Sequence, residues 1–164
     1  MSSSLKPLYY FAYGSNMNPA RVAERKLPIE GEPLAGELAN FKLSFNKISR
    51  YREGAASANI EACDQAVVKG VLYRLTASDV IESMDRFENS PEDYAREVVF
   101  VQLTGIAADD RVGSLVSAWT YIAKPHAIDN SLHPTREYMG HLLASPFMCD
   151  TERARLRLIK CFDD

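Results

Sequence analysis

The pattern of apolar and polar positions predicts most of the strands of this chain. Residues 8–13 read LYYFAY, a continuous apolar run that is typical of a strand buried on both faces. Residues 37–48 alternate between apolar and polar side chains, which indicates a strand with one buried face. Residues 54–60, GAASANI, are small and favour a strand that passes close to another segment. The same patterns predict three further strands, at 66–75, 94–104 and 114–123.

Helical periodicity is clearest over residues 76–88. Apolar side chains recur there with the helical period, and Thr76 or Ser78 is placed to cap the helix. A shorter helix is predicted over 19–26, because Asn18 followed by a proline resembles an N-cap followed by the first helical residue.

Two further helices are predicted toward the end of the sequence, over 134–145 and 150–162, with His133 or Asp150 as capping candidates. The resulting order of strands and helices is neither a regular βαβ alternation nor a sandwich of hairpins. We therefore expect a mixed sheet, open or closed into a barrel, with helices around it.

Composition and charge narrow the class of partner. The 164 residues suit one domain, 1–164, and 46% apolar with 25% charged residues is ordinary for a globular protein. A formal net charge of −3 and a pI of about 5.7 argue against a nucleic acid or an anionic membrane as the main partner. The start, MSSSLKP, is a poor signal peptide, and no segment approaches a membrane span. A cytoplasmic location is expected.

The common catalytic and metal-binding arrangements are missing from the sequence. No G-x-S-x-G motif surrounds Ser15, and neither a Walker loop nor a dinucleotide fingerprint occurs. The histidines and cysteines show no metal-ligand spacing, and an odd number of cysteines suits a reducing compartment; they are His126, His133, His141, Cys63, Cys149 and Cys161. We expect no metal, no cofactor and no covalent nucleophile.

The segment Tyr13-Gly14-Ser15-Asn16-Met17 joins a predicted strand directly to a predicted helix. A glycine there allows backbone geometry closed to other residues, and a turn that leads into a helix presents free N–H groups to a carboxylate or an oxyanion. A purely structural turn, in which the asparagines cap the helix, explains the same residues.

Asp85 and Glu88 are the second candidate for chemistry. A spacing of three places both carboxyl groups on one face near the end of the 76–88 helix, where the helix dipole disfavours negative charge. A carboxyl group there can have a raised pKa and act as a general acid and base. A solvated acidic helix end is the plain alternative. Other acidic residues nearby are expected on the surface: Glu82, Glu92 and Glu97.

Taken together, these segments resemble one protein family. Residues 10–17, YFAYGSNM, resemble the Y-G-S-N-L/M signature of the γ-glutamylcyclotransferase family, which includes γ-glutamylamine cyclotransferases and AIG2-like proteins. Further segments follow in the family's order and at its usual distances: 41–45, 54–60, 67–75, 84–99 and the PTREY of 134–138. The likeness covers residues 8–145.

The resemblance implies an α+β fold, a small mixed β-barrel flanked by helices, with its pocket between the turn and a glutamate. Glu88 matches the family's catalytic glutamate, which would serve as the general acid and base. The implied substrate is a small γ-glutamyl compound, cyclised to 5-oxoproline with release of an amine by a monomer or homodimer. The implied substrate-binding residues are Tyr13, Gly14, Ser15, Asn16, Met17, Tyr94 and Tyr138.

The sequence departs from the family pattern after the glutamate. Asn89 stands where glycine is common, and the loop from Glu88 to Tyr94 is short. Two alternatives to catalysis therefore stay open: a protein that binds a small carboxylate in the same pocket without turnover, and an interaction protein whose pocket is inactive.

Overall fold

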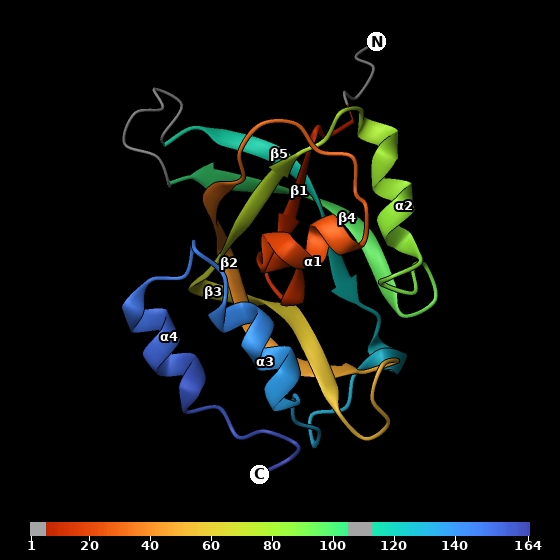
Figure 1. Ribbon diagram of the computed structural model, residues 1–164, viewed down its shortest axis with the longest axis vertical. Coiled ribbons are helices and arrows are strands. Elements are labelled where there is room, and N and C mark those ends of the chain that lie inside the picture. The colour runs from red at the N-terminus through yellow and green to blue at the C-terminus, as the bar shows by residue number, and fades with distance from the viewer. Residues whose placement is uncertain (1–5, 105–112) are drawn as a thin grey trace.

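The computed structural model describes residues 6–104 and 113–164, and its centre is a closed five-stranded barrel (Figure 1). Around the barrel the strand order is β1-β3-β2-β4-β5, and β1 closes it by pairing parallel to β5. The other neighbours pair antiparallel. The strands are β1 (Tyr9–Ala12), β2 (Leu34–Ile48), β3 (Ala56–Arg74), β4 (Tyr94–Leu103) and β5 (Leu115–Ala123). The expected α+β fold with a mixed barrel is confirmed.

Short helices cover parts of the barrel (Figure 1). The α-helices are α1 (Pro19–Glu24), α2 (Glu82–Asp85), α3 (Arg136–Leu143) and α4 (Asp150–Arg157), and the 3₁₀ helices are η1 (Ser15–Met17), η2 (Ser78–Ile81) and η3 (Pro125–Ala127). None of the helices in the described part of the chain is long and apolar enough to cross a membrane.

The continuous apolar run of β1 is explained by burial on both faces. Its alternate residues Tyr9 and Phe11 join a cluster of strand residues that fills the barrel. Tyr10 and Ala12 face the other way, into a cluster that also contains helix residues and lies between the barrel and its helices. Because both faces are covered, no polar position interrupts the strand.

The two strands expected at 54–60 and 66–75 form the single strand β3, so that prediction is wrong. The polar residues between the two segments look like a loop in the sequence. In the structure the pairing with β2 shifts register there instead of ending. Asn40 and Gln65, opposite each other at the shift, both have positive φ, and the side chain of Asn40 accepts a hydrogen bond from the N–H of Gln65 at 3.1 Å. A β-bulge of this kind bends a strand without breaking it.

The predicted helix 76–88 is much shorter in the structure. It consists of η2 and one turn of α2, and the chain beyond Asp85 continues in turns with i→i+3 hydrogen bonds. The expected cap is also wrong, because Ala77 occupies the N-cap without a side-chain bond. This tight path turns Glu88 away from the surface.

The caps of the other helices differ in part from those expected. Asn18 caps α1 as predicted, accepting from the N–H of Ala20 at 3.2 Å, and proline follows as the first helical residue. The expected caps His133 and Asp150 are wrong. Thr135 caps α3 through its side chain, and Cys149 occupies the N-cap of α4 without a side-chain bond.

Candidate functional site

The turn after β1 is held in place by contacts with distant strands. The hydroxyl of Tyr13 donates to the backbone carbonyl of Tyr121 on β5. Gly14 has a negative φ of −112°, so positive φ is not why glycine is needed there. A Cβ on Gly14 would lie 2.7 Å from the Tyr138 hydroxyl and 3.2 Å from the Cβ of Ala58. Space, rather than unusual backbone conformation, therefore explains this glycine.

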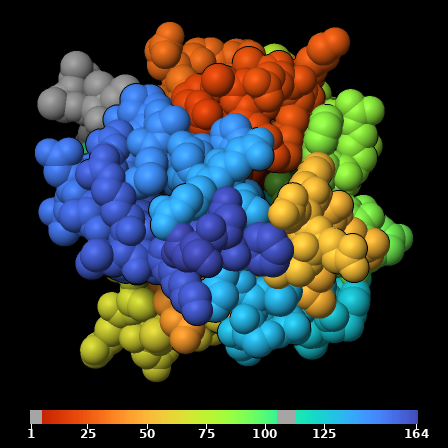
Figure 2. All heavy atoms as spheres, turned by 60° about the horizontal axis from the view of Figure 1, so that its bottom comes forward, coloured from red at the N-terminus to blue at the C-terminus, as the bar shows by residue number. Residues whose placement is uncertain are grey.

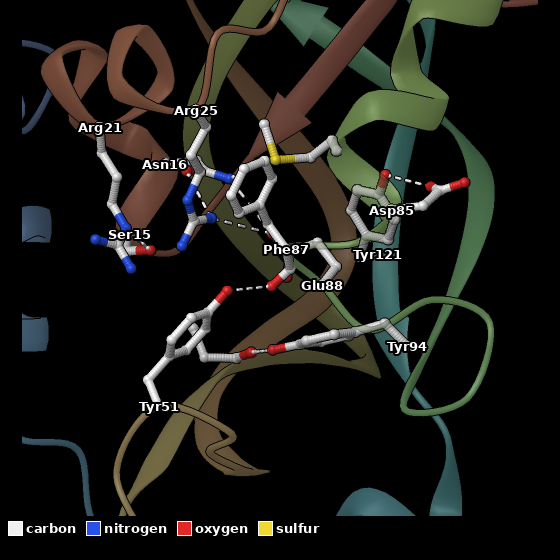
Figure 3. Close-up of polar contacts among 12 residues, drawn as sticks. Ser15, Asn16, Arg21, Arg25, Tyr51, Asp85, Phe87, Glu88, Tyr94 and Tyr121 are labelled. Atoms are coloured by element: carbon white, nitrogen blue, oxygen red, sulfur yellow. Dashed lines mark hydrogen bonds and ion pairs between the residues drawn. The ribbon is translucent and has the colours of Figure 1, made fainter.

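Asn16 connects the turn to the predicted catalytic residue (Figure 3). Its side-chain nitrogen lies 3.3 Å from Oε1 of Glu88 and donates to the hydroxyl of Tyr10 at 2.9 Å. Arg25 donates to its Oδ1 at 3.1 Å, and Tyr73 donates to its backbone carbonyl at 2.6 Å. Asn16 therefore does not cap a helix, and the alternative in which it does so is wrong for this residue.

Glu88 projects its carboxyl group into a cavity lined by the turn and the barrel (Figure 3). Its side chain is 17% exposed, and the guanidinium of Arg25 lies 3.9 Å from its Oε1. Burial raises the pKa of Glu88, and the charges of Arg25 and Lys47 partly oppose that rise. A carboxyl group whose pKa is raised by burial is suited to both accept and donate a proton.

Asp85 and Glu88 do not share a helix face, contrary to expectation. Asp85 accepts hydrogen bonds from Tyr121 and Arg96, each at 2.7 Å, whereas Glu88 turns toward Asn16 (Figure 3). Because α2 ends at Asp85, Glu88 lies in the following turn and the helical spacing no longer applies. The ion pair of Asp85 is structural, and only Glu88 lines the cavity.

Asn89 preserves the backbone conformation that a glycine would favour after the glutamate. Its φ is +46°, in the left-handed region that asparagine adopts more readily than most other residues. The carbonyl of Asn89 also accepts the N–H of Asp93 at 2.8 Å, which closes the turn that carries Glu88. The departure from the family pattern therefore leaves the turn conformation intact.

Tyr94 and Tyr138 both bond the backbone of one residue of β3, Ala58. Tyr94 donates its hydroxyl to the carbonyl of Ala58 at 2.5 Å, and the N–H of Ala58 donates to the hydroxyl of Tyr138 at 3.0 Å. Burial raises the pKa of Tyr138 to about 12, and burial likewise raises the pKa of Tyr94. Both phenols are therefore neutral at physiological pH and line the cavity as hydrogen-bonding groups.

A buried ion pair that the sequence did not indicate supports the wall of this cavity. Lys47 is 4% exposed, its ammonium lies 3.1 Å from Asp93, and it also lies 4.9 Å from the centre of the Tyr94 ring. Arg50 bonds both oxygens of Asp93, at 2.6 and 2.9 Å. These bonds hold the pKa of Asp93 well below its usual range. No local motif signals the group, because Lys47 comes from β2, Arg50 from the loop after it and Asp93 from the loop before β4.

Tyr51 crosses the cavity on the solvent side (Figure 3). Its hydroxyl donates to the carbonyl of Phe87 at 2.7 Å, next to Glu88. The guanidinium groups of Arg21 and Arg25 lie 5.9 and 5.7 Å from the centre of its ring. No motif surrounds Tyr51 in the loop between β2 and β3, so its place in the cavity could not be predicted from the sequence.

The structure gathers seven of the eight predicted site residues around one cavity: Tyr13, Gly14, Ser15, Asn16, Glu88, Tyr94 and Tyr138. Met17 is the exception, since its side chain is buried in the core between barrel and helices. The N–H of Met17 donates to the carbonyl of Gly14 at 2.9 Å. Within residues 6–104 and 113–164, no group of three or more side chains is arranged to hold a metal ion.

Solved structures with the same fold include proteins of the expected family. A gamma-glutamyl cyclotransferase is 20% identical, with a TM-score of 0.78 over 97% of this chain and 91% of that one. A human protein described as uncharacterized is also 20% identical, with a TM-score of 0.77 over 98% and 92%. A yeast gamma-glutamyl cyclotransferase specific to glutathione is 15% identical, with a TM-score of 0.58 over 93% and 86%. At these identities the likeness establishes the fold.

The sequence itself provides the assignment to a family. No curated protein matches the chain significantly. The model of the family described as gamma-glutamyl cyclotransferase, AIG2-like, matches residues 10–140, which include both the Y-G-S-N turn and Glu88. The chain therefore belongs to the gamma-glutamyl cyclotransferase, AIG2-like family.

Proposed function

We propose that the protein is a cyclotransferase that converts a γ-glutamyl compound into 5-oxoproline and a free amine, with Glu88 as its general acid and base. The observation that carries the proposal is the largely buried carboxyl of Glu88, held by Asn16 of the Y-G-S-N turn at the wall of a cavity. Family membership supports the same reaction class.

The reaction suits a site that mainly positions its substrate. A γ-glutamyl amide carries its own nucleophile, the α-amine, and closing a five-membered ring requires the chain to fold back on itself. Holding that conformer in a rigid cavity can supply ~7–11 kcal/mol of the barrier. The hydrogen bonds of Tyr94 and Tyr138 to the backbone of Ala58 fix one wall of the cavity, which supports this positioning of the substrate.

Glu88 moves the proton that the cyclisation requires. Its carboxylate accepts a proton from the α-ammonium, and the freed lone pair forms a bond from nitrogen to the γ-carbonyl carbon. Protonated Glu88 then donates to the leaving nitrogen as the original amide C–N bond breaks. The attacking nitrogen loses its second proton to water, and the released amine takes up a proton from water. General acid–base catalysis of this kind contributes about 10²–10⁴-fold.

The backbone N–H groups of the turn are the proposed donors to the negative charge that develops on the γ-carbonyl oxygen. The N–H of Met17 is already bonded to Gly14, and that of Ser15 is bonded to the Tyr138 hydroxyl, so the candidates are the N–H groups of Gly14 and Asn16, residues that line the cavity. Preorganised donors of this type stabilise an oxyanion at little cost of rearrangement.

The experiment is to measure 5-oxoproline release from γ-glutamyl amino acids, γ-glutamylamines and a γ-glutamyl peptide. Glu88→Gln should lose about 10²–10⁴-fold in kcat. Glu92→Gln is the matched control, since Glu92 is exposed and outside the cavity. Full activity of Glu88→Gln would exclude the proposed role of Glu88. Binding of these compounds without any product would instead indicate a protein that binds a small carboxylate without turnover.

A further inference from the structure

A second cavity adjoins the one that contains Glu88. It lies where the loop between β2 and β3, α3 and the C-terminal residues meet, on the face that Figure 2 presents. Three residues line both cavities: Arg21, Tyr51 and Tyr138. These three side chains therefore lie at the boundary between the two cavities.

Arg21 differs from the other cations of the main cavity because it lacks an acidic partner. Arg25 pairs with Glu88, and both Lys47 and Arg50 pair with Asp93. Among the residues that the structure describes, Arg21 forms no ion pair.

The guanidinium of Arg21 is nevertheless fixed in position. Its Nε donates to the hydroxyl of Ser15 at 3.0 Å, and its Nη1 lies 3.4 Å from Nε2 of His141. Within the described part of the chain its Nη2 has no hydrogen-bond partner, and Arg21 lies where the two cavities meet.

The electrostatic surroundings of Arg21 favour an anion. Partial burial and the nearby charge of Arg25 lower the pKa of Arg21, and the charge of the exposed Glu24 only partly opposes them, so the guanidinium is incompletely compensated in the free protein. His141 supplies no counter-charge, since imidazole is neutral or cationic, and burial and the charge of Arg21 lower its pKa. A bound carboxylate at Arg21 would supply the missing counter-charge.

We propose that Arg21 binds a carboxylate on the leaving group of the substrate, which selects γ-glutamyl amino acids and peptides over γ-glutamylamines that lack this group. This inference rests on the proposed cyclotransferase function. With the γ-glutamyl part beside Glu88, the amine released from the scissile bond extends past Tyr51 into the second cavity, and Arg21 lies at that crossing point.

The second cavity also has acidic side chains, and their arrangement is compatible with this assignment. The carboxylate of Asp163 accepts the N–H of Arg136 at the start of α3 at 3.0 Å. Glu137 is exposed to solvent, where its charge is screened. A second cation, Arg52, lines the same cavity and lies over the ring of Phe162 at 5.3 Å.

The test compares γ-glutamylalanine with γ-glutamylalaninamide, which has nearly the same size but no carboxylate. The unmodified protein should favour the acid by about tenfold or more in kcat/KM, mostly through KM, as expected for a hydrogen bond between two charged groups. Arg21→Gln should remove this preference, and Arg21→Lys should keep part of it. Arg157→Gln, an exposed arginine outside both cavities, should keep all of it.

Three outcomes would overturn the inference while leaving cyclotransferase activity in place. They are equal use of the two compounds by the unmodified protein, preference for the amide, and an equal loss on both compounds in Arg21→Gln. The last outcome would mean that Arg21 only supports the turn through Ser15.

Absence of 5-oxoproline from both compounds, and from the wider set of γ-glutamyl compounds, would contradict the proposed function instead. Calorimetric binding of the same pair then decides the inference. Tighter binding of the acid that is lost in Arg21→Gln supports it, and equal or undetectable binding of both compounds overturns it.

Discussion

The side-chain nitrogen of Asn16 lies 3.3 Å from Oε1 of Glu88, although 72 residues separate the two in the chain. The contact joins the turn after β1 to the turn after α2. Arg25 completes the arrangement, because it donates to Asn16 and lies 3.9 Å from Glu88. Asn16 thus fixes the position of the proposed proton carrier and supplies a donor that favours its charged form.

Asn16→Asp should shift the pH dependence of catalysis. A carboxylate in place of the amide would remove a donor to Glu88 and put a like charge beside it, and both changes raise the pKa of Glu88 further. The acid limb of the kcat/KM profile should therefore move to higher pH by about one unit or more. Asn18→Asp is the control, because it adds the same charge at the cap of α1 and should leave the acid limb in place. An unshifted acid limb in Asn16→Asp would contradict the proposed influence of Asn16 on Glu88.

Glu88 should make the folded state less stable as the pH rises. Its folded pKa is raised, so between the unfolded value of about 4.3 and the folded value the native state binds more protons than the unfolded state. The stabilisation that Glu88 contributes is fully present below its unfolded pKa, and it is lost as the pH rises through its folded pKa. Thermal unfolding from pH 4 to 8 should show the protein losing stability relative to Glu88→Gln, which mimics the protonated form. A difference that is constant with pH would contradict the raised pKa.

Part of the site could be predicted from the sequence because its signals are local. The turn that contains Gly14 and Asn16 forms one short motif. Glu88 lies in a second short segment, a few residues before Tyr94, the first residue of β4. The buried pair of Lys47 with Asp93 gave no such signal. Its two residues are ordinary in sequence and gain their role only when β2 and the loop before β4 come together in the barrel.

The fold was predictable where the apolar pattern of a single element reflects its burial, and less so where it depends on pairing or turns. The continuous run of β1 identified a strand covered on both faces, as the two core clusters show. Periodicity over 76–88 indicated a long helix, but i→i+3 bonds after Asp85 turn the chain early. The β-bulge at Asn40 and Gln65 depends on pairing between strands, which neither strand's own pattern reveals.

Gly14→Ala should impair the site through one specific clash. The added Cβ would lie 2.7 Å from the hydroxyl of Tyr138, and either the turn or α3 would have to shift. We expect a loss of at least tenfold in kcat/KM, since small displacements in a positioned site are costly. Tyr138→Phe removes the clashing oxygen, so the double variant should lose less than the sum of the two single losses. Strictly additive losses in both activity and melting temperature would show that the clash is not the cause.

Asp93→Asn should destabilise the protein far more than Arg50→Gln. Removing the carboxylate leaves the ammonium of Lys47, only 4% exposed, without its partner, whereas Arg50 is 62% exposed and hydrated in either state. The loss of one partner of a buried pair costs on the order of 3 kcal/mol. Chemical denaturation at pH 7 measures both variants.

The effect of Asp93→Asn should also depend on pH in a defined direction. The folded pKa of Asp93 is lowered, so its stabilisation is present above the unfolded value of about 3.9 and is lost as the pH falls toward the folded value. The stability difference between the protein and Asp93→Asn should therefore shrink when the comparison is repeated near pH 3. Equal stability of the two at pH 7 would show that Lys47 gains nothing from Asp93, and the wall beside Tyr94 would need another explanation.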